Sequence, residues 1–180
     1  MAGCVSRLRR VLVLLPLAVG LSAAPLRAQP PAGEADAKVR FTLTLARFVQ
    51  WPADMERASL RLCVLQRSPA LAAAFASRQG TVVTGRVLDV LGGDAVRTAS
   101  CDLLFVDASA GGAGAEALAA VAGRPVLTLG TVDGFASHGG MVELVNVDDA
   151  LRFDVNLAPL RAAHLGLSSQ ALKLARRVQE

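Results

Sequence analysis

The sequence predicts an α/β domain with a mostly parallel sheet of about six strands, helices on both faces and a C-terminal antiparallel hairpin. Two observations predict this fold. Short apolar runs typical of strands alternate with segments of helical character, and parallel strands need such crossover helices. Near the end, two apolar runs instead flank the turn-forming residues Asp148-Asp149-Ala150, a pattern typical of a hairpin.

The elements of the domain follow from local patterns in chain order. Apolar residues at helical spacing predict a helix over residues 38–49, which Trp51-Pro52 ends. Ser68-Pro69 and the Gly/Ala segment before Glu116 predict the starts of two further helices. Two short helices are predicted at the end, around 158–164 and from Ser168 or Ser169 to residue 178. Apolar runs predict strands over residues 60–65, 87–91, 103–106, 126–129, 141–147 and 151–156.

The composition and charge of the chain exclude several classes of protein. With 53% hydrophobic and 19% charged residues, the sequence is typical of a folded domain rather than a disordered or collagen-like chain. The formal net charge of +4 comes from four arginines in the first 28 residues, which contain no acid, so the rest of the chain is formally neutral. A neutral chain has no charge excess for phosphates, and we expect no nucleic-acid partner.

Residues 1–28 have the pattern of a secretory signal peptide. A basic start precedes an apolar run that begins at Val11, and small residues lead to Ala28. The apolar run is shorter than the roughly 20 residues that a membrane-spanning helix needs. We expect cleavage near Ala28 and a periplasmic mature chain that does not insert into the membrane. Residues 29–36 are expected to form a flexible lead-in, followed by a single domain over residues 37–180.

Cys63 and Cys101 are the cysteines that follow the leader, and each lies on or beside a predicted strand. An even pair in an oxidising compartment indicates one disulfide. The alternative is two buried free thiols that pack as small hydrophobic side chains. A bridge of this span would stabilise the fold by roughly 3–4 kcal/mol by constraining the unfolded chain. At this stage the bridge is open to a structural role and to a role as a reversible redox switch.

No motif in the chain indicates catalysis, a cofactor or a metal. Residues 112–117 match a loose Gly-x-Gly-x-x-Ala pattern, but they follow the third predicted strand, and a Gly/Ala loop entering a helix is expected there. His138 and His164 have no second ligand at a metal-binding spacing. The chain lacks a Gly-x-Ser-x-Gly nucleophile motif. We expect a binding protein without cofactor or metal, not an enzyme.

Trp51, the one tryptophan of the chain, follows the first predicted helix. Two roles are open for it. One is a core anchor at the helix end. The other is a partly exposed aromatic that meets a partner or a small apolar ligand.

Four blocks of the sequence together resemble the YfiR family of periplasmic proteins. Three of them are residues 48–52, 62–69 and 101–106. The fourth and most specific block runs from Arg152-Phe153-Asp154-Val155-Asn156-Leu157 to Gly166-Leu167-Ser168-Ser169-Gln170 and on to Ala175. The blocks span nearly the whole chain after the leader.

The resemblance implies an α/β sandwich that acts as a binding protein. In the best-understood members, the protein binds the periplasmic sensor domain of an inner-membrane diguanylate cyclase and holds that enzyme inactive, which lowers cyclic di-GMP and disfavours biofilm. The implied partner is therefore such a cyclase or a similar sensor protein, and a homodimer stays open. The family's redox theme fits Cys63 and Cys101. This chain lacks the second cysteine pair that some relatives carry near residues 134–141.

The resemblance carries over to particular residues. The first motif is matched by Phe48, Trp51 and Pro52, and the closing motif by Arg152, Phe153, Asp154, Asn156, Ser168, Ser169 and Gln170. Asn156 and Ser168 or Ser169 are expected to satisfy backbone donors at the starts of helices. From the family's binding role, we expect Leu157 and Leu160, beside Met141, to form an apolar partner surface. Trp51 is a further candidate for partner or ligand binding.

The alternative function is a periplasmic small-molecule binding or sensing module. Its pocket would be formed by Trp51 and the carboxyl ends of the strands. A cleft with a few convergent polar groups would favour this module, and a shallow apolar patch without a cleft would favour the repressor.

Overall fold

The computed structural model describes residues 32–180 apart from 53, 54, 56 and 93–100. The expected signal peptide over residues 1–28 and the first residues of the expected lead-in, 29–31, lie outside the described residues. Helix α1 (Ala32–Ala46) begins before the expected start of the domain at residue 37, so residues 32–36 form its first turn. Within the described part of the chain, no helix has the length and apolar character of a membrane span.

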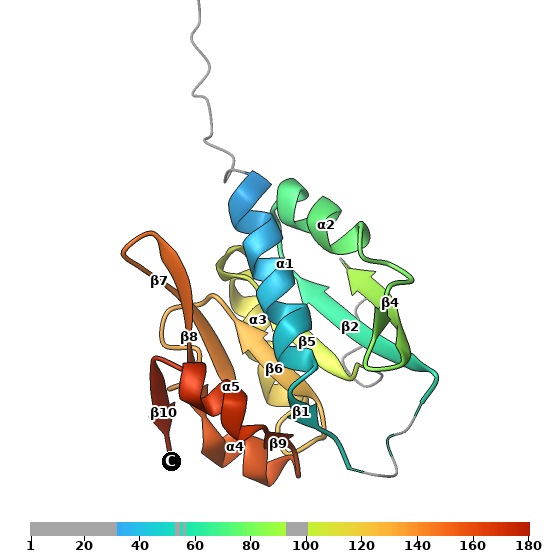
Figure 1. Ribbon diagram of the computed structural model, residues 1–180. Helices are drawn as coiled ribbons and strands as arrows, with labels where there is room; N and C mark the ends of the chain where they lie inside the picture. Colours follow the sequence, from blue (N-terminus) through green and yellow to red (C-terminus); the bar gives the residue numbers. More distant parts are fainter. Residues whose placement is uncertain (1–31, 53–54, 56, 93–100) are drawn as a thin grey trace, which may run out of the picture.

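An eight-stranded sheet forms the centre of the fold (Figure 1). Its strands are β2 (Ser59–Leu65), β3 (Val82–Val83), β4 (Arg86–Gly92), β5 (Leu103–Val106), β6 (Leu127–Gly130), β7 (Val142–Val147), β8 (Ala150–Asn156) and β10 (Arg177–Gln179). Their order is β10-β8-β7-β6-β5-β2-β4-β3, and neighbours run parallel except in the pairs β3–β4 and β7–β8. The predicted α/β fold with its mostly parallel sheet is confirmed. The short outer strands β3 and β10 are additional to the predicted strands.

Helices cover both faces of the sheet, because the inner strands present apolar side chains on both sides. Besides α1, the helices are α2 (Pro69–Ala76), the 3-10 turn η4 (Ala108–Ala110), α3 (Gly112–Ala120), α4 (Leu157–Ala162) and α5 (Ser169–Leu174). Leu62 and Val64 of β2 belong to one core with residues of α1, α2 and α4, whereas Cys63 belongs to a second core with Ala117 of α3. Figure 1 shows α1 lying across the near face of the sheet.

Helix α3 approaches the sheet closely at one glycine. A Cβ atom on Gly114 would lie 2.5 Å from Val106 Cγ1 on β5, so a side chain at this position would force the helix away. Residues 112–117 all belong to α3. The prediction of a Gly/Ala loop that enters a helix differs from the structure here, because the helix already begins at Gly112. Close packing against β5 accounts for a glycine in this Gly-x-Gly-x-x-Ala segment.

The C-terminal hairpin of β7 and β8 is confirmed, with antiparallel pairing from Val142↔Val155 to Val147↔Ala150. Its two turn residues, Asp148 and Asp149, have φ angles of 49° and 58°. Aspartate tolerates this left-handed conformation better than most residues, and turns with two such residues match the twist of a two-residue hairpin.

Two helix ends differ from the prediction. α1 ends at Ala46 rather than at residue 49, because β1 (Val49–Gln50) pairs antiparallel with β9 (Gly166–Leu167). α5 ends at Leu174 rather than at residue 178, because the backbone becomes extended at Ala175 and β10 then pairs parallel with β8. In both places, a strand distant in sequence supplies hydrogen bonds that outweigh local helix propensity.

Candidate functional site

Two buried aspartates mark the two ends of the central strand β5. Asp102 directly precedes the strand and Asp107 directly follows it. Each carboxylate binds polar groups from other elements. The Asp102 cluster lies at the amino ends of the parallel strands and consists of Arg57, Arg61, Arg86 and Asp102. The Asp107 cluster lies at their carboxyl ends and consists of Glu34, Lys38, Asp107, Ser109 and Thr131.

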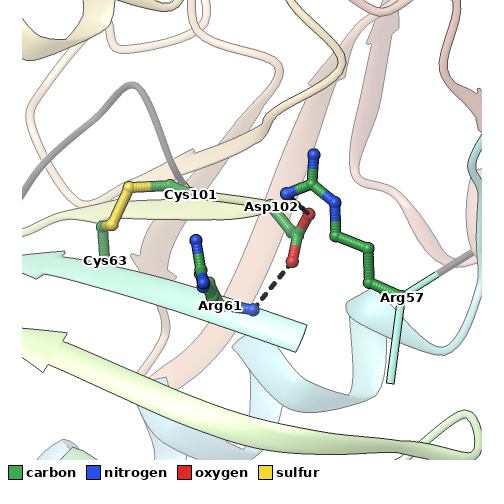
Figure 2. Close-up of a disulfide and its surroundings, with 5 residues drawn as sticks. All are labelled: Arg57, Arg61, Cys63, Cys101 and Asp102. Carbon is green, nitrogen blue, oxygen red and sulfur yellow. Dashed lines mark hydrogen bonds and ion pairs between the residues drawn. A yellow bond between two sulfur atoms is a disulfide. The ribbon is translucent and has the colours of Figure 1, made fainter. Parts of the chain in front are cut away.

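A disulfide joins β2 to the residue next to Asp102 (Figure 2). It links Cys63 and Cys101, whose Cα atoms are 5.8 Å apart. Cys63 has no solvent exposure and Cys101 has 4%. Cys63 lies on β2 and pairs with Leu104 of β5, and Cys101 lies just before β5 begins. The bridge therefore ties the amino-terminal end of β5 to the neighbouring strand β2.

Asp102 is fully buried and accepts two hydrogen bonds through the same oxygen. The backbone N–H of Arg61 and the guanidinium of Arg86 each donate to Oδ2 at 2.8 Å. The other oxygen, Oδ1, lies 4.0 Å from the guanidinium of Arg57. Figure 2 shows Arg57 and Arg61 on either side of the carboxylate. The cluster therefore couples the starts of β2, β4 and β5 beside the disulfide.

Trp51 lies at this same amino-terminal edge. The Arg86 guanidinium carbon is 5.8 Å from the centroid of the Trp51 ring, within the range of a cation–π contact. The side chain is half-buried against the first core, and its indole N–H is buried without a hydrogen-bond acceptor among the described residues. The prediction that Trp51 and the carboxyl ends of the strands form one pocket is therefore wrong. Trp51 lies at the amino ends of the strands, and the length of the strands separates it from their carboxyl ends.

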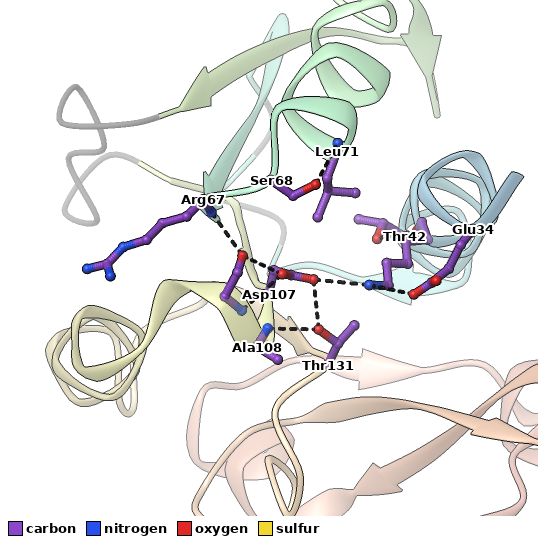
Figure 3. Close-up of polar contacts among 10 residues, drawn as sticks. Glu34, Thr42, Arg67, Ser68, Leu71, Asp107, Ala108 and Thr131 are labelled. Atoms are coloured by element: carbon purple, nitrogen blue, oxygen red, sulfur yellow. Dashed lines mark hydrogen bonds and ion pairs between the residues drawn. The ribbon is translucent and has the colours of Figure 1, made fainter. Parts of the chain in front are cut away.

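The Asp107 cluster connects α1 to the carboxyl ends of β5 and β6 (Figure 3). Asp107 Oδ1 accepts from Lys38 Nζ at 3.2 Å and from the Thr131 hydroxyl at 3.0 Å. Its Oδ2 accepts from the hydroxyl and the backbone N–H of Ser109, at 2.6 and 3.0 Å. Lys38 also lies 3.0 Å from Glu34 Oε1 on the preceding turn of α1.

The Lys38–Asp107 pair is held in its charged form. Burial acts to raise the pKa of Asp107, but hydrogen bonds from Ser109 and the charge of Lys38 outweigh burial and hold that pKa below its ordinary value. Burial likewise acts to lower the pKa of Lys38, but Glu34 and Asp107 outweigh it and hold that pKa above its ordinary value. A general acid or base works best with a pKa near the working pH, so this pair is suited to binding and structure.

A polar cavity of about 540 Å³ adjoins the Asp107 cluster. Its walls come from α1, the residues after β5 and β6, the β7–β8 hairpin and Arg176. From β2 the chain continues to β4 on one side, whereas β5 and β6 follow on the other side of β2, so the strand order reverses between β2 and β5. Helix α2 packs on one face of the sheet and α3 on the other. In open α/β sheets, ligands bind outside the carboxyl ends of the strands at such a switch point. We call this space the carboxyl-edge cavity.

The described residues form no cluster of three or more His, Cys, Asp or Glu side chains that could hold a metal ion. The polar groups of the carboxyl-edge cavity include Lys38 and Thr131, which both donate hydrogen bonds to Asp107. Such an arrangement can bind a polar molecule.

The expected apolar partner surface is only partly exposed. Met141 is 3% exposed and Leu160 is 1% exposed, and both belong to the first core. Their inclusion in an exposed patch is wrong, because both side chains point into the core rather than outward. Leu157 is half-buried against the same core.

The residues of the family motifs divide into structural and exposed positions. Asn156 Oδ1 accepts the N–H of Ala158 at 3.0 Å, and Ser168 Oγ accepts the N–H of Ala171 at 3.3 Å, so these side chains cap α4 and α5. Asp154 is buried and binds the guanidinium of Arg176 through both oxygens. Buried or half-buried positions also include Phe48, Pro52 and Phe153, and exposed positions include Arg152, Ser169 and Gln170.

Exposed apolar side chains also occur outside the predicted site residues. Near the C-terminus, Leu174 at the end of α5 is 71% exposed, and Val178 on the outer strand β10 is 41% exposed. At the opposite edge, Val82 is 62% exposed and Val87 is 49% exposed, and these two valines are direct cross-strand partners. Val82 and Val178 lie on the outer strands β3 and β10, which patterns within a single segment cannot identify as sheet edges.

The sequence profile of the YfiR/HmsC-like family matches residues 35–176 of the chain. The resemblance found in the four sequence blocks is therefore confirmed over nearly all of the described structure. None of the curated proteins matches the chain.

Two solved structures share the fold. A conserved domain protein from Vibrio cholerae has a TM-score of 0.53 and 10% sequence identity, over 81% of this chain and 60% of that one. The ABC domain in complex with L-Trp from Streptococcus pneumonia has a TM-score of 0.56 and 10% identity, over 80% of this chain and 60% of that one. The chain thus spans about 60% of the length of each, and at this identity the likeness concerns the fold alone.

Proposed function

The chain belongs to the YfiR/HmsC-like family, and from that premise we propose that it is a periplasmic regulatory binding protein. It represses an inner-membrane diguanylate cyclase by binding the periplasmic sensor domain of that enzyme, and so lowers cyclic di-GMP. The protein contributes binding energy rather than catalysis. The ionised Lys38–Asp107 pair supports this assignment, since neither group has the pKa of a general acid or base at neutral pH.

One observation about the closing motif carries the proposal. Leu174, at the end of the most specific block of the family pattern, is 71% exposed although it is a large aliphatic residue. Val178 on β10 is also exposed, and α4, which begins with Leu157, packs beside β10. Leu157, Leu174 and Val178 form what we call the C-terminal surface. Leu174 and Val178 are exposed and Leu157 is half-buried, and apolar side chains left at the surface are typical of partner-binding sites.

The backbone at this surface adds a second means of binding. Among the described strands, β10 pairs only with β8, so its other edge has unpaired N–H and C=O groups. A partner can add a strand to such an edge while side-chain pockets provide specificity. The sensor domain of the cyclase is the partner that we assign to the C-terminal surface.

A cellular measurement of cyclic di-GMP tests this function. Cells that produce the membrane cyclase alone are compared with cells that also export this chain. We expect the chain to lower cyclic di-GMP when the cyclase retains its periplasmic domain and to have no effect when that domain is deleted. Equal cyclic di-GMP with and without the chain would contradict the proposal.

The carboxyl-edge cavity favours a second candidate function, the binding of a small polar ligand. The cavity lies outside the carboxyl ends of β5, β6 and β7, and a domain of similar fold has been solved with L-Trp. A ligand with higher affinity for the free protein would release the cyclase by linkage, so both functions can operate in one protein. Thermal unfolding with a panel of amino acids, L-Trp included, tests this idea. A rise in Tm that Asp107→Asn abolishes would support it, and no rise with any amino acid would contradict it.

A further inference from the structure

An arginine stripe runs along the outer face of α1. Arg40 and Thr44 are exposed and lie four residues apart on one side of the helix, and exposed Arg47 directly follows the helix, with its N–H bonded to the carbonyl oxygen of Thr44. The opposite side carries buried residues such as Val39 and Ala46, which pack in the first core. The stripe therefore faces away from the sheet.

A third arginine lies across a hollow from this stripe. Arg78 follows α2, and together with Arg40, Leu43, Thr44 and Arg47 it lines a hollow of about 230 Å³ between the two helices. A second hollow of about 280 Å³ shares Arg40 and Thr44 and also includes Phe41. We call the first of these spaces the arginine hollow. Three arginine residues thus line one small space.

The charges in the arginine hollow are poorly neutralised by the protein. Among the described residues, neither the Arg40 guanidinium nor the Arg47 guanidinium has a hydrogen-bond or ion-pair partner. Arg78 Nη2 lies 3.8 Å from Asp36 Oδ1, which is the carboxylate paired with it. Arg78 Nε is buried and has no acceptor among the described residues. A buried donor without an acceptor is unusual in folded proteins, and a ligand oxygen beside Arg78 Nε would satisfy it.

We propose that the arginine hollow binds a phosphate group, either of a lipid head group or of a free phosphate. The planar guanidinium presents paired N–H donors that match the oxygens of phosphate. Phosphate carries more negative charge and more acceptor oxygens than a carboxylate, which can accept the paired N–H donors of one guanidinium. Phosphate is therefore a better match than a carboxylate for three guanidiniums. The Thr44 hydroxyl supplies a further donor, and Arg78 Nε gains the acceptor that it lacks. This binding is separate from the C-terminal surface and holds even if the cyclase partner is wrong.

Two binding measurements on the chain without its leader test the proposal. One titrates inorganic phosphate and follows the arginine Nε–Hε resonances by NMR. The other measures co-sedimentation with vesicles of phosphatidylglycerol and phosphatidylcholine, and with vesicles of phosphatidylcholine alone. We expect phosphate to shift the resonances of Arg40, Arg47 and Arg78. Phosphatidylglycerol binding would identify the lipid head group as the source, and phosphate binding without vesicle binding would identify a soluble phosphate.

Arg40→Gln combined with Arg47→Gln is the principal variant, because both side chains are exposed and the fold does not depend on them. We expect it to weaken binding about thirtyfold, which corresponds to about 1 kcal/mol for each surface arginine. Arg78→Lys keeps the positive charge but removes the paired N–H donors of the guanidinium. This variant should also weaken phosphate binding. The matched control is Arg67→Gln with Arg177→Gln, which removes two exposed arginines elsewhere and should leave binding unchanged.

Three outcomes would overturn the proposal. The first is the absence of both phosphate and vesicle binding. The second is equal binding by the principal variant and the wild type. The third is binding of an acidic peptide with no binding of phosphate, since that result would assign the arginine hollow to protein carboxylates.

Discussion

The guanidinium of Arg86, at the start of β4, donates a 2.8 Å hydrogen bond to the buried carboxylate of Asp102, just before β5. Arg86 also donates to the carbonyl oxygen of Ser59 at the start of β2 and lies beside the ring of Trp51. The Arg86–Asp102 pair therefore connects the starts of β2, β4 and β5, and it lies beside Trp51 and next in sequence to the disulfide.

We expect Asp102→Ala to destabilise the fold by about 3–5 kcal/mol, because it leaves the Arg86 charge largely buried without its counter-ion. Urea unfolding measures this loss. The intrinsic fluorescence comes from Trp51 alone and should change in the folded state, since Arg86 is no longer held against the ring.

Arg57→Gln is the control for this prediction. The Arg57 side chain is 51% exposed and lies 4.0 Å from Asp102, so its loss should cost less than about 1 kcal/mol. Equal stability of wild type and Asp102→Ala would show that the Asp102 cluster does not hold the strand starts together.

Cys63→Ser should lower the stability of the oxidised protein by about 4 kcal/mol, because the bridge spans a long loop in the unfolded chain. Thermal unfolding under oxidising conditions provides the measurement, with reduced wild type as the comparison. Reduced wild type and the variant should melt at similar temperatures. If oxidised wild type and Cys63→Ser have the same Tm, the bridge does not stabilise this fold.

The Lys38–Asp107 pair predicts a defined pH dependence. Since the folded-state pKa of Asp107 is lowered, its contribution to stability is present above the unfolded-state pKa of about 4 and is lost as pH falls through the folded-state value. Since the folded-state pKa of Lys38 is raised, its contribution is present below about pH 10 and is lost as pH rises through the folded-state value. The pair therefore stabilises the protein fully between these limits.

Asp107→Asn tests the acid limb of this dependence. We expect the variant to lose about 1–3 kcal/mol at pH 7 and to show a smaller further loss than wild type between pH 5 and pH 2. Asp149→Asn, in the exposed turn of the β7–β8 hairpin, is the control and should retain the wild-type acid limb. An unchanged acid limb in Asp107→Asn would contradict the assignment.

Local pattern was sufficient to predict the inner strands and the hairpin turn. The apolar run at residues 103–106 forms β5 with the predicted bounds, because a strand buried on both faces needs a continuous apolar run. Residues 177–179 could not be predicted as a strand by the same logic. Pairing with β8 and the Arg176–Asp154 ion pair hold β10 in its extended conformation. Both interactions join residues that are distant in sequence.

The site was less predictable than the fold. Asp102 and Asp107 flank a buried strand in the sequence, which is a signal for polar groups at both ends of the sheet. Their partners Arg86 and Lys38 come from distant elements, so the pairs required the structure. Met141 and Leu160 were selected for hydrophobicity alone, which cannot separate a core residue from an exposed one.

Leu174→Asp combined with Val178→Asp should weaken binding to the cyclase sensor domain at least tenfold, because two charges would replace apolar contacts at the C-terminal surface. Val82→Asp with Val87→Asp is the matched control, since it places the same charges on an exposed apolar pair at the opposite edge of the sheet. Isothermal titration with the isolated sensor domain gives the affinities. A larger loss in the control than in the test variant would move the partner surface to the β3–β4 edge.

A pull-down from membranes tests whether this protein binds a membrane cyclase. Residues 29–180 serve as bait for solubilised inner membranes, and mass spectrometry identifies the captured proteins. We expect the wild type to capture a diguanylate cyclase and the variant with both Leu174→Asp and Val178→Asp to lose that capture. Recovery of no cyclase by the wild type, in oxidising and in reducing buffer alike, would contradict this expectation.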